Sequence, residues 1–357
     1  MEREGAAALA ADVVGYGGLK GEQKAGTLAV FKASQMAGQD LATRRGKESE
    51  LAQADPLDEN PVDRRGAPNR DELTISFEFF PPRNKDAEDR LVRDIGGLEP
   101  LSPRFVSVTY GAGGGTRKNT LAMTKRIAVE TTISSAAHLT CIGARRDEVD
   151  AVAREFWDSG IRHIVAVRGD PPDGASVYQP HPHGYAYAAD MVAGLKCIAD
   201  FEISVAAYPE IHPEASSASQ DLDALKRKLD AGATRAITQF FFDTEVFSRF
   251  VERARAAAID VPIVAGVMPI TNFDRVYRFA RHCRVAIPGE LAALFDGHRQ
   301  DPATCRRLAI EVAAEQCRQL RAQGQQEFHI YTMNDTQMAA SIRNLLHNAG
   351  QSSYASP

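Results

Sequence analysis

The sequence predicts an α/β protein: a single (β/α)₈ TIM barrel over residues 71–357, preceded by a disordered or loosely structured extension over residues 1–70. Short apolar, β-rich runs recur from Leu73 onward, and stretches with apolar residues at three- and four-residue spacing separate them. Strands that alternate with helices form parallel sheets, and eight such units close into a barrel. The runs are apolar throughout, which is typical of strands covered on both faces.

The extension over residues 1–70 differs in composition from the rest of the chain. Ala, Gly, Lys, Asp and Glu dominate it, and Asp55–Arg65 resembles a solvated linker. Such a segment cannot bury enough apolar surface to fold alone. We therefore expect a mobile tail without a catalytic role, with at most a marginal helix near Gly26–Thr43.

The barrel elements follow from the pattern in order. The runs predicted as strands are Leu73–Phe80, Phe105–Tyr110, Ala136–Ile142, His163–Arg168, Ile203–Tyr208, Ala236–Phe242, Ile263–Met268 and Phe328–Thr332. Helices are predicted between them, among them Lys85–Gly96, Arg145–Ser159, Ser219–Ala231 and Glu245–Ala258. Gly160 and Gly232 are predicted to end two of these helices and turn the chain toward the next strand.

A doubly wound open sheet is the alternative fold. It would be expected to carry a G-x-G-x-x-G turn after an early strand. The run Gly111-Ala112-Gly113-Gly114-Gly115-Thr116 places Thr116 where the third glycine belongs, and no lysine completes a P-loop. The run fits a flexible loop better than a nucleotide fingerprint, and the barrel is favoured.

Composition excludes several classes of function. The net charge is -5 and the pI about 6.0, so no basic field attracts nucleic acid or an anionic membrane. The five cysteines are odd in number and form no C-x-x-C pair, so neither a disulfide framework nor a metal site is expected. No apolar run approaches the roughly 20 residues that span a bilayer, and the N-terminus is no secretory signal. A cytoplasmic protein is predicted.

Polar residues end nearly every predicted strand, where a barrel carries its catalytic groups. They are Glu78, Thr109, Tyr110, His138, Arg168, Asp170, Tyr208, Glu210, His212 and Gln239. Packing alone does not account for polar groups at these positions. A site at this end of the barrel is therefore predicted.

Glu78 is the most informative of them, because it lies among aromatics in Ser76-Phe77-Glu78-Phe79-Phe80. Alternation sends Ser76, Glu78 and Phe80 to one face of the strand. Burial among aromatics is expected to raise the pKa of the carboxyl, which suits a general acid near neutral pH. The alternative is a structural carboxylate paired with an arginine.

Two other groups of candidates keep alternative interpretations. Asp170 follows Gly169, which permits close approach to a ligand, but an aspartate before two prolines is also a common turn or cap residue. Arg227 and Lys228 on a predicted helix could bind phosphates, although a charge run is more often a solvated face.

These residues carry a resemblance to the methylenetetrahydrofolate reductase family. The similar segments run in order from about residue 73 to 345 and include Ser76–Pro82, Phe105–Ala112, His138–Cys141, Gly160–Ile164, Arg168–Asp170, Ser204–His212 and Gly232–Asp243. The chain resembles the short bacterial form, which lacks the regulatory domain of eukaryotic relatives.

The resemblance implies FAD at the barrel mouth and a ping-pong reaction in the cytoplasm. NADH or NADPH would reduce the flavin, which would then reduce methylenetetrahydrofolate to methyltetrahydrofolate and so supply methyl groups for methionine synthesis. A homo-oligomer is implied as well. The residues implied to contact FAD are Tyr110, Ala112, His138, Arg168, Gly169, Asp170, Ala188, Tyr208, His212, Ala215, Asp221, Arg227 and Lys228.

The resemblance also implies roles at the reacting groups. Glu78 would protonate the N10 nitrogen of the folate, and Asp170 would lie near flavin and folate. Thr109, Gln239 and Phe279 would place the nicotinamide, and Gln239 would also bind the pterin.

Three positions depart from the family pattern. Arg275 stands where relatives often carry Gln, and Ala224 replaces a polar residue that contacts FAD. Asp335 stands where an arginine commonly binds the glutamate tail of folate, so Arg275 could have taken over this role. Two other functions stay open: electrons could come from a partner protein instead of a nicotinamide, or the barrel could bind folate or flavin without catalysis.

Overall fold

The computed structural model describes residues 73–82, 84–110, 117–170 and 178–351. Within them, eight parallel strands close into a barrel in chain order, and the last strand pairs with the first. The predicted TIM barrel is confirmed. The strands are β1 Thr74–Phe79, β2 Val106–Val108, β3 Ser135–Thr140, β4 His163–Val167, β5 Glu202–Ala207, β6 Arg235–Thr238, β7 Ile263–Val267 and β8 Glu327–Tyr331.

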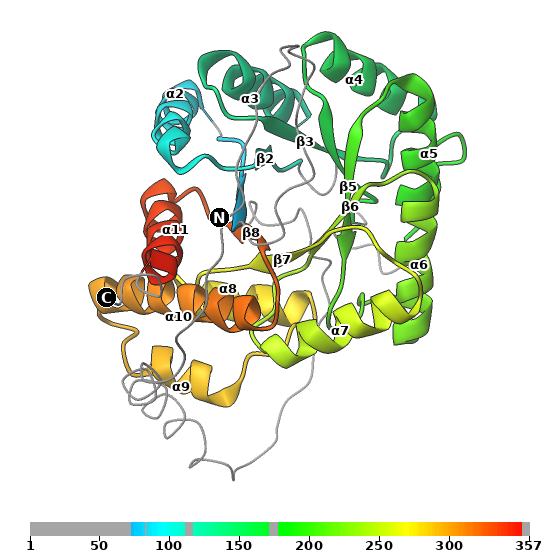
Figure 1. The fold of residues 1–357 in the computed structure, drawn as a ribbon. Helices are drawn as coiled ribbons and strands as arrows, with labels where there is room; N and C mark the ends of the chain where they lie inside the picture. Colours follow the sequence, from blue (N-terminus) through cyan, green and yellow to red (C-terminus); the bar gives the residue numbers. More distant parts are fainter. Residues whose placement is uncertain (1–72, 83, 111–116, 171–177, 352–357) are drawn as a thin grey trace, which may run out of the picture.

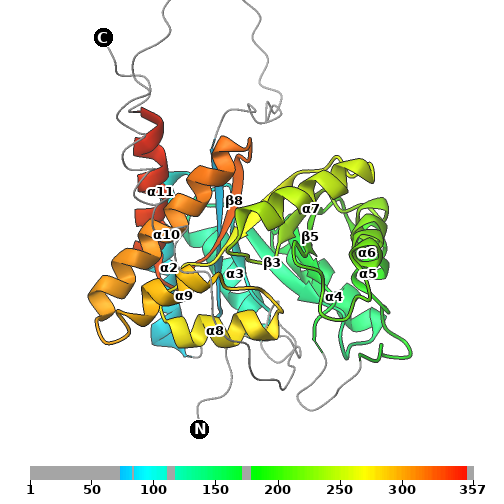
Figure 2. The ribbon, with the colours of Figure 1, turned by 90° about the horizontal axis from the view of Figure 1, so that it is seen from below.

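Helices surround the strands on the outside of the barrel (Figures 1 and 2). They are α2 Lys85–Gly96, α3 Arg117–Glu130, α4 Arg146–Asp158, α5 Ala188–Ile198, α6 Ala218–Asp230, α7 Thr244–Ala256, α8 Phe273–His282, α9 Gly289–Asp296, α10 Pro302–Ala322 and α11 Thr336–Gln351, with a 3₁₀ turn at Glu99–Leu101. Gly160 and Gly232 adopt φ values of 84° and 114°, which glycine accepts easily, and both follow helix ends as predicted.

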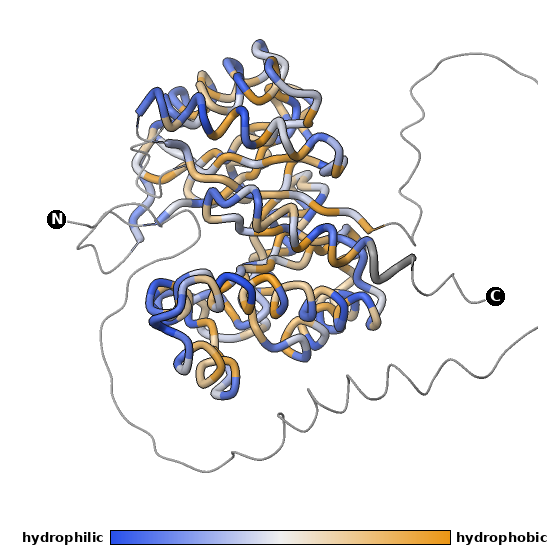
Figure 3. Tube along the Cα trace, turned by 90° about the vertical axis from the view of Figure 1, so that its left-hand side faces the viewer, coloured by the Kyte–Doolittle hydropathy of each residue, from blue (hydrophilic) through white to orange (hydrophobic). Residues whose placement is uncertain are grey.

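The core has two layers because neighbouring residues of a strand face opposite sides. Outward-facing residues such as Phe77, Val108 and Leu139 pack against the helices. Inward-facing residues such as Val165 and Ile237 fill the barrel. In Figure 3 the apolar segments lie mainly inside, and polar segments form much of the outer surface.

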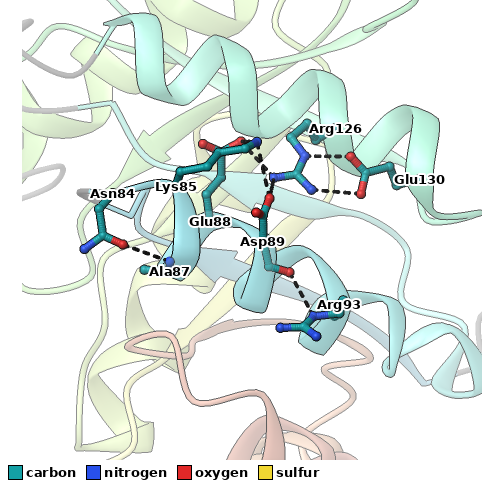
Figure 4. A network of polar contacts seen from close by, with 8 residues as sticks. All are labelled: Asn84, Lys85, Ala87, Glu88, Asp89, Arg93, Arg126 and Glu130. Atoms are coloured by element: carbon teal, nitrogen blue, oxygen red, sulfur yellow. Dashed lines mark hydrogen bonds and ion pairs between the residues drawn. The ribbon is translucent and has the colours of Figure 1, made fainter.

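An ion-pair network joins α2 to α3 on the surface (Figure 4). Arg126 of α3 contacts Glu88 at 3.0 Å and Asp89 at 2.5 Å on α2, and Glu130 at 2.6 Å on its own helix. Asn84 caps α2 by accepting a hydrogen bond from the Ala87 backbone N–H at 2.9 Å. Polar groups thus fix the outer faces of two helices whose apolar faces cover the barrel.

The predicted extension over residues 1–70, the helix near Gly26–Thr43 and the glycine run with Ala112 lie outside the described residues. None of the helices in the described part of the chain is long and apolar enough to cross a membrane.

Candidate active site

The predicted site residues come from several strands, at or just beyond their carboxyl ends. Glu78 is the last residue but one of β1, and His138 lies on β3. Thr109, Arg168 and Gln239 directly follow β2, β4 and β6. The barrel therefore gathers these positions at one end, as the sequence predicts.

Glu78 is buried inside the barrel, with 4% of its surface exposed. Its Oε2 atom lies 3.2 Å from Nε2 of His138 and 3.3 Å from Nε2 of His329. The Thr332 hydroxyl donates a hydrogen bond of 2.6 Å to the Glu78 carbonyl oxygen and so ties β1 to the end of β8. Two imidazoles thus face one carboxyl oxygen.

Not all the aromatic residues next to Glu78 in the sequence surround its carboxyl, although Tyr331, its register partner on β8, lies close enough to be affected by its charge. Phe77 and Phe79 belong to the outer core layer, because strand alternation turns them away from Glu78. Ser76 and Glu78 face inward, as alternation predicts. No arginine pairs with Glu78 among its described contacts, so the interpretation as an arginine-bound carboxylate is not supported either.

The predicted rise of the Glu78 pKa is wrong for the protein alone. Burial by itself raises this pKa, but the contacts with His138 and then with His329 lower it, and the pKa falls to about 2. The physical reason is that nearby positive charge stabilises the carboxylate more than burial destabilises it. The Glu78 carboxylate is therefore coupled electrostatically to both imidazoles.

Sequence reasoning missed His329, which lies in the middle of β8. Its Nδ1 atom is 2.7 Å from the Ser76 hydroxyl. Barrel closure brings the two together, because Ser76 is the register partner of His329. Alternation along β8 and the pairing of the first with the eighth strand could have identified this residue.

Arg168 is held on two sides at the end of β4. Its guanidinium forms a two-pronged ion pair with Glu214, with distances of 2.5 and 2.8 Å, and lies 4.2 Å from the centre of the Tyr178 ring. Gly169 has a φ of 89°, a conformation that favours glycine. Glu214 and Tyr178 were not predicted, because loop residues follow no periodic pattern.

Asp170 lies near Tyr208 and Cys283. Burial first and then the Asp170 charge raise the pKa values of the Tyr208 hydroxyl and the Cys283 thiol above their ordinary range. The Asp170 carboxylate thus disfavours ionisation of these two neighbouring groups. The prolines that follow Asp170 lie outside the described residues, so its turn or cap interpretation stays untested.

Tyr208, His212 and Asp221 form a cluster after β5. The rings of Tyr208 and His212 meet edge to face with centres 4.6 Å apart, and Asp221 accepts a hydrogen bond of 3.2 Å from the His212 backbone N–H. Burial and then the Arg168 charge lower the His212 pKa to about 4. His212 is therefore a neutral imidazole at pH 7.

Arg227 and Lys228, the two basic residues predicted on this helix, lie in different environments on α6. Lys228 donates a hydrogen bond to the Ala206 carbonyl of β5, and burial lowers its pKa to about 8. Arg227 is exposed. Lys228 is thus directed at the barrel wall, whereas Arg227 lies on a solvated helix face in the protein alone.

The other predicted residues lie around the same end. Gln239 and Thr109 are buried, with 3% and 2% of their surfaces exposed. Arg275 and Phe279 lie one turn apart on α8, where Arg275 is exposed and Phe279 is partly buried against the core. Ala188 begins α5, and Ala215 lies between β5 and α6. The Tyr110 side chain belongs to the outer core layer, so only its backbone could contact a ligand in the mouth.

Asp335 has a structural role in the protein alone. Its carboxylate pairs with the Arg306 guanidinium from α10 and accepts a hydrogen bond of 2.9 Å from the Met338 backbone N–H at the start of α11. Both partners belong to the protein, so this departure from the family pattern has a local explanation.

Comparison with known proteins gives this site a context. The family model described as methylenetetrahydrofolate reductase matches residues 64–350. The chain belongs to the methylenetetrahydrofolate reductase family. The predicted resemblance is confirmed.

Two similar proteins carry the name of this family. The 5,10-methylenetetrahydrofolate reductase of Escherichia coli is 45% identical over 295 residues, which cover 83% of this chain and 96% of the relative. The Salmonella typhimurium protein of the same name is 47% identical over 275 residues, 77% of this chain and 91% of the relative.

A solved structure shares the fold. It is described as an uncharacterized protein from Clostridium thermocellum that binds two copies of 5-methyl-5,6,7,8-tetrahydrofolic acid, with a TM-score of 0.55 and 15% identity. The alignment covers 78% of this chain and 95% of that chain. At this identity the likeness concerns the fold alone.

Proposed function

We propose that the protein is a flavin-dependent oxidoreductase that reduces 5,10-methylenetetrahydrofolate to 5-methyltetrahydrofolate with NADH or NADPH as the hydride donor. The names of its relatives support the reaction class. The observation that carries the proposal is Glu78, a buried carboxyl with two imidazoles at the end of the barrel where catalytic groups gather. This reaction needs an acid, and Glu78 with its neighbours can supply a proton.

The mouth residues fit FAD. Nδ1 of His138 is buried without a hydrogen-bond partner among the described residues, and Nε2 faces only the Glu78 carboxyl, as expected of a group that a ligand completes. Arg168, Arg227 and Lys228 would provide the positive charge that a diphosphate requires, with Arg168 and Lys228 exchanging their present contacts with Glu214 and the Ala206 carbonyl for it. Gly169 has no side chain, so a ligand can approach its backbone closely. When bound, the flavin would carry the hydride between nicotinamide and folate.

In this proposal the protein binds and orients its substrates and moves one proton. Glu78 delivers the proton to the N10 nitrogen of the folate, which opens the five-membered ring for hydride transfer. Thr109, Gln239 and Phe279 orient the flat rings of nicotinamide and folate. The Asp170 carboxylate would place a negative charge near the bound flavin and so favour hydride donation.

The first test is the colour of the purified protein. We expect a yellow protein that releases FAD on denaturation, identified by chromatography, and whose flavin is bleached by NADH or NADPH without another protein. Bleaching only with an added electron-transfer protein would favour the partner-dependent reaction. Bound flavin or folate without turnover would favour a binding protein, and a colourless protein that cannot be reconstituted would refute the proposal.

A further inference from the structure

A hydrogen-bonded chain behind Glu78 runs into the barrel. The Ser76 hydroxyl lies 3.3 Å from the carbonyl oxygen of Phe328 and 2.7 Å from Nδ1 of His329. At the other side of the ring, Nε2 of His329 lies 3.3 Å from Oε2 of Glu78. All three residues are buried, with at most 4% of the surface of each exposed.

The hydrogen-bond partners assign the protons along this chain. A carbonyl oxygen can only accept, so we assign the hydroxyl proton of Ser76 to the bond with Phe328. The hydroxyl oxygen then accepts from Nδ1–H of His329. With Nδ1 protonated, the contact between Nε2 and Oε2 contains one proton, either as imidazolium and carboxylate or as neutral imidazole and carboxylic acid.

We propose that His329, anchored by Ser76, is a positioning residue that stores the proton delivered by Glu78. This inference rests on the proposed function. In the resting site the proton is on Nε2, and during folate reduction the N–H bond breaks while an O–H bond forms on Glu78. No electrons are transferred in this step. Glu78 then gives the proton to the folate nitrogen, and solvent returns one proton per turnover.

The proposal accounts for the low pKa of Glu78, which by itself does not fit an acid at neutral pH. The proton that the reaction needs is present in the pair even while Glu78 is ionised. A coupled pair releases protons as a unit, so the acidity that governs the rate belongs to both groups.

His138 contacts the same oxygen but is less suited to this role. Its Nε2 atom faces Glu78 at 3.2 Å, but its Nδ1 atom has no hydrogen-bond partner among the described residues, so no neighbour on that side fixes its tautomer. His329 is fixed by Ser76 and by the Phe105 ring, which stacks on it with centres 5.7 Å apart. An anchored imidazole keeps its proton directed at one acceptor.

Other titratable groups around His329 complete the setting. They are Glu78 from β1, His138 from β3, His163 from β4 and Tyr331 from β8. Burial lowers the pKa of His163 to about 3. His163 is therefore neutral at pH 7 and leaves Glu78 as the acidic partner of His329.

The barrel contains a matched control for His329. His163 is also buried and also pairs with a serine, since its Nε2 lies 2.8 Å from the Ser204 hydroxyl. It also contacts Phe105, with ring centres 4.5 Å apart. No contact joins it to Glu78 among the described residues. It reaches His329 only through its charge and the shared Phe105 ring, so His163→Gln removes a similar core histidine and leaves the hydrogen bonds of the proton chain in place.

The experiment compares His329→Gln with His163→Gln by stopped-flow measurement of the two half-reactions in the flavin-loaded protein. We expect His329→Gln to slow folate reduction about 10- to 100-fold and to leave flavin reduction by NADH within about twofold. The high-pH limb of the folate half-reaction should move to lower pH, because a carboxylic acid alone (about 4.3) is a stronger acid than an imidazolium (about 6.5). His163→Gln should change neither rate.

A second measurement does not depend on turnover. The ring-nitrogen NMR signals of His329 should change with Glu78→Gln, whereas those of His163 should not. The inference is overturned if folate reduction is unaffected by His329→Gln, if both half-reactions fall equally, or if His163→Gln has the same effect. Unchanged His329 signals in Glu78→Gln would overturn it too. A protein without flavin or turnover would refute the proposed function, and the NMR comparison would still report on the proton chain.

Discussion

A carboxylate inside a barrel costs free energy unless charge or hydrogen bonds compensate it. At Glu78 the compensation comes from His138 and His329, which reach the same oxygen from β3 and β8. Both imidazoles lie within 3.3 Å of this oxygen, and together they lower the pKa of Glu78 by more than burial raises it. In the proposed function Glu78 exchanges a proton with these neighbours instead of with water.

Glu78→Gln tests the role of this carboxyl. The amide is nearly isosteric, so the fold and the flavin site should be retained. Flavin reduction by NADH needs no proton from Glu78 and should be intact, whereas folate reduction should fall by about 10² or more, as expected when a general acid is lost. Stopped-flow absorbance of the flavin measures each half separately. Equal impairment of both halves would mean that Glu78 organises the site instead of supplying the proton.

Single residues mark the limit of prediction from sequence. Glu78 could be identified because it interrupts an apolar strand at the expected end. Its pKa could not, because the charges that set it come from strands distant in sequence: His329 is 251 residues away. The same applies to Arg168, whose partner Glu214 lies in a loop 46 residues further on.

At the scale of elements, the sequence predicts the bounds of a helix correctly where a capping residue and the spacing of apolar residues indicate the same start and end. Helix α2 has the predicted bounds, Lys85–Gly96, because Asn84 caps its start and its apolar residues repeat at helical spacing. The predicted strand Ala236–Phe242 extends too far, since β6 ends at Thr238. Phe240 and Phe241 are buried but lie beyond the strand, and apolar composition alone cannot distinguish a buried loop from a strand.

The start of α11 yields a prediction about stability. Burial alone would raise the pKa of Asp335, but the hydrogen bond from Arg306 lowers it below the ordinary 3.8. Asp335→Asn keeps a capping side chain and removes the charge, so it should lower the free energy of unfolding at pH 7 by about 1 kcal/mol. Denaturant unfolding of both proteins measures the difference.

The sign of the pH dependence follows from the lowered pKa. The Asp335 contribution is present above pH 3.8 and is lost as the pH falls through the pKa of the folded protein. Wild type and Asp335→Asn should therefore converge in stability below that pH. Arg306→Gln should behave in the same way as Asp335→Asn. A difference that persists in acid would show that the ion pair is not its source.

At the scale of the whole molecule, ion pairs at one end of the barrel join its strands, and the candidate site lies at the other end. At the end where the strands begin, Arg235 is buried at 3% exposure and pairs with Glu202 and Glu327, which joins β5, β6 and β8. At the other end are Glu78, His138, Arg168 and Asp170. This division between stability and chemistry is the usual one in the fold and was predictable once eight strands had been recognised.

Closure of the barrel also predicts the result of removing residues 1–70. The first strand begins at Thr74 and already has both neighbours, β2 and β8, so the described sheet needs no further strand. All proposed site residues follow residue 77, and the family match begins at residue 64. A chain that starts at Asp71 should keep its flavin content, its thermal midpoint and both half-reaction rates within about twofold of the full chain. Absorbance, thermal unfolding and stopped-flow kinetics measure these three quantities. Loss of flavin or of solubility would instead mean that the extension packs on the barrel and contributes to its stability.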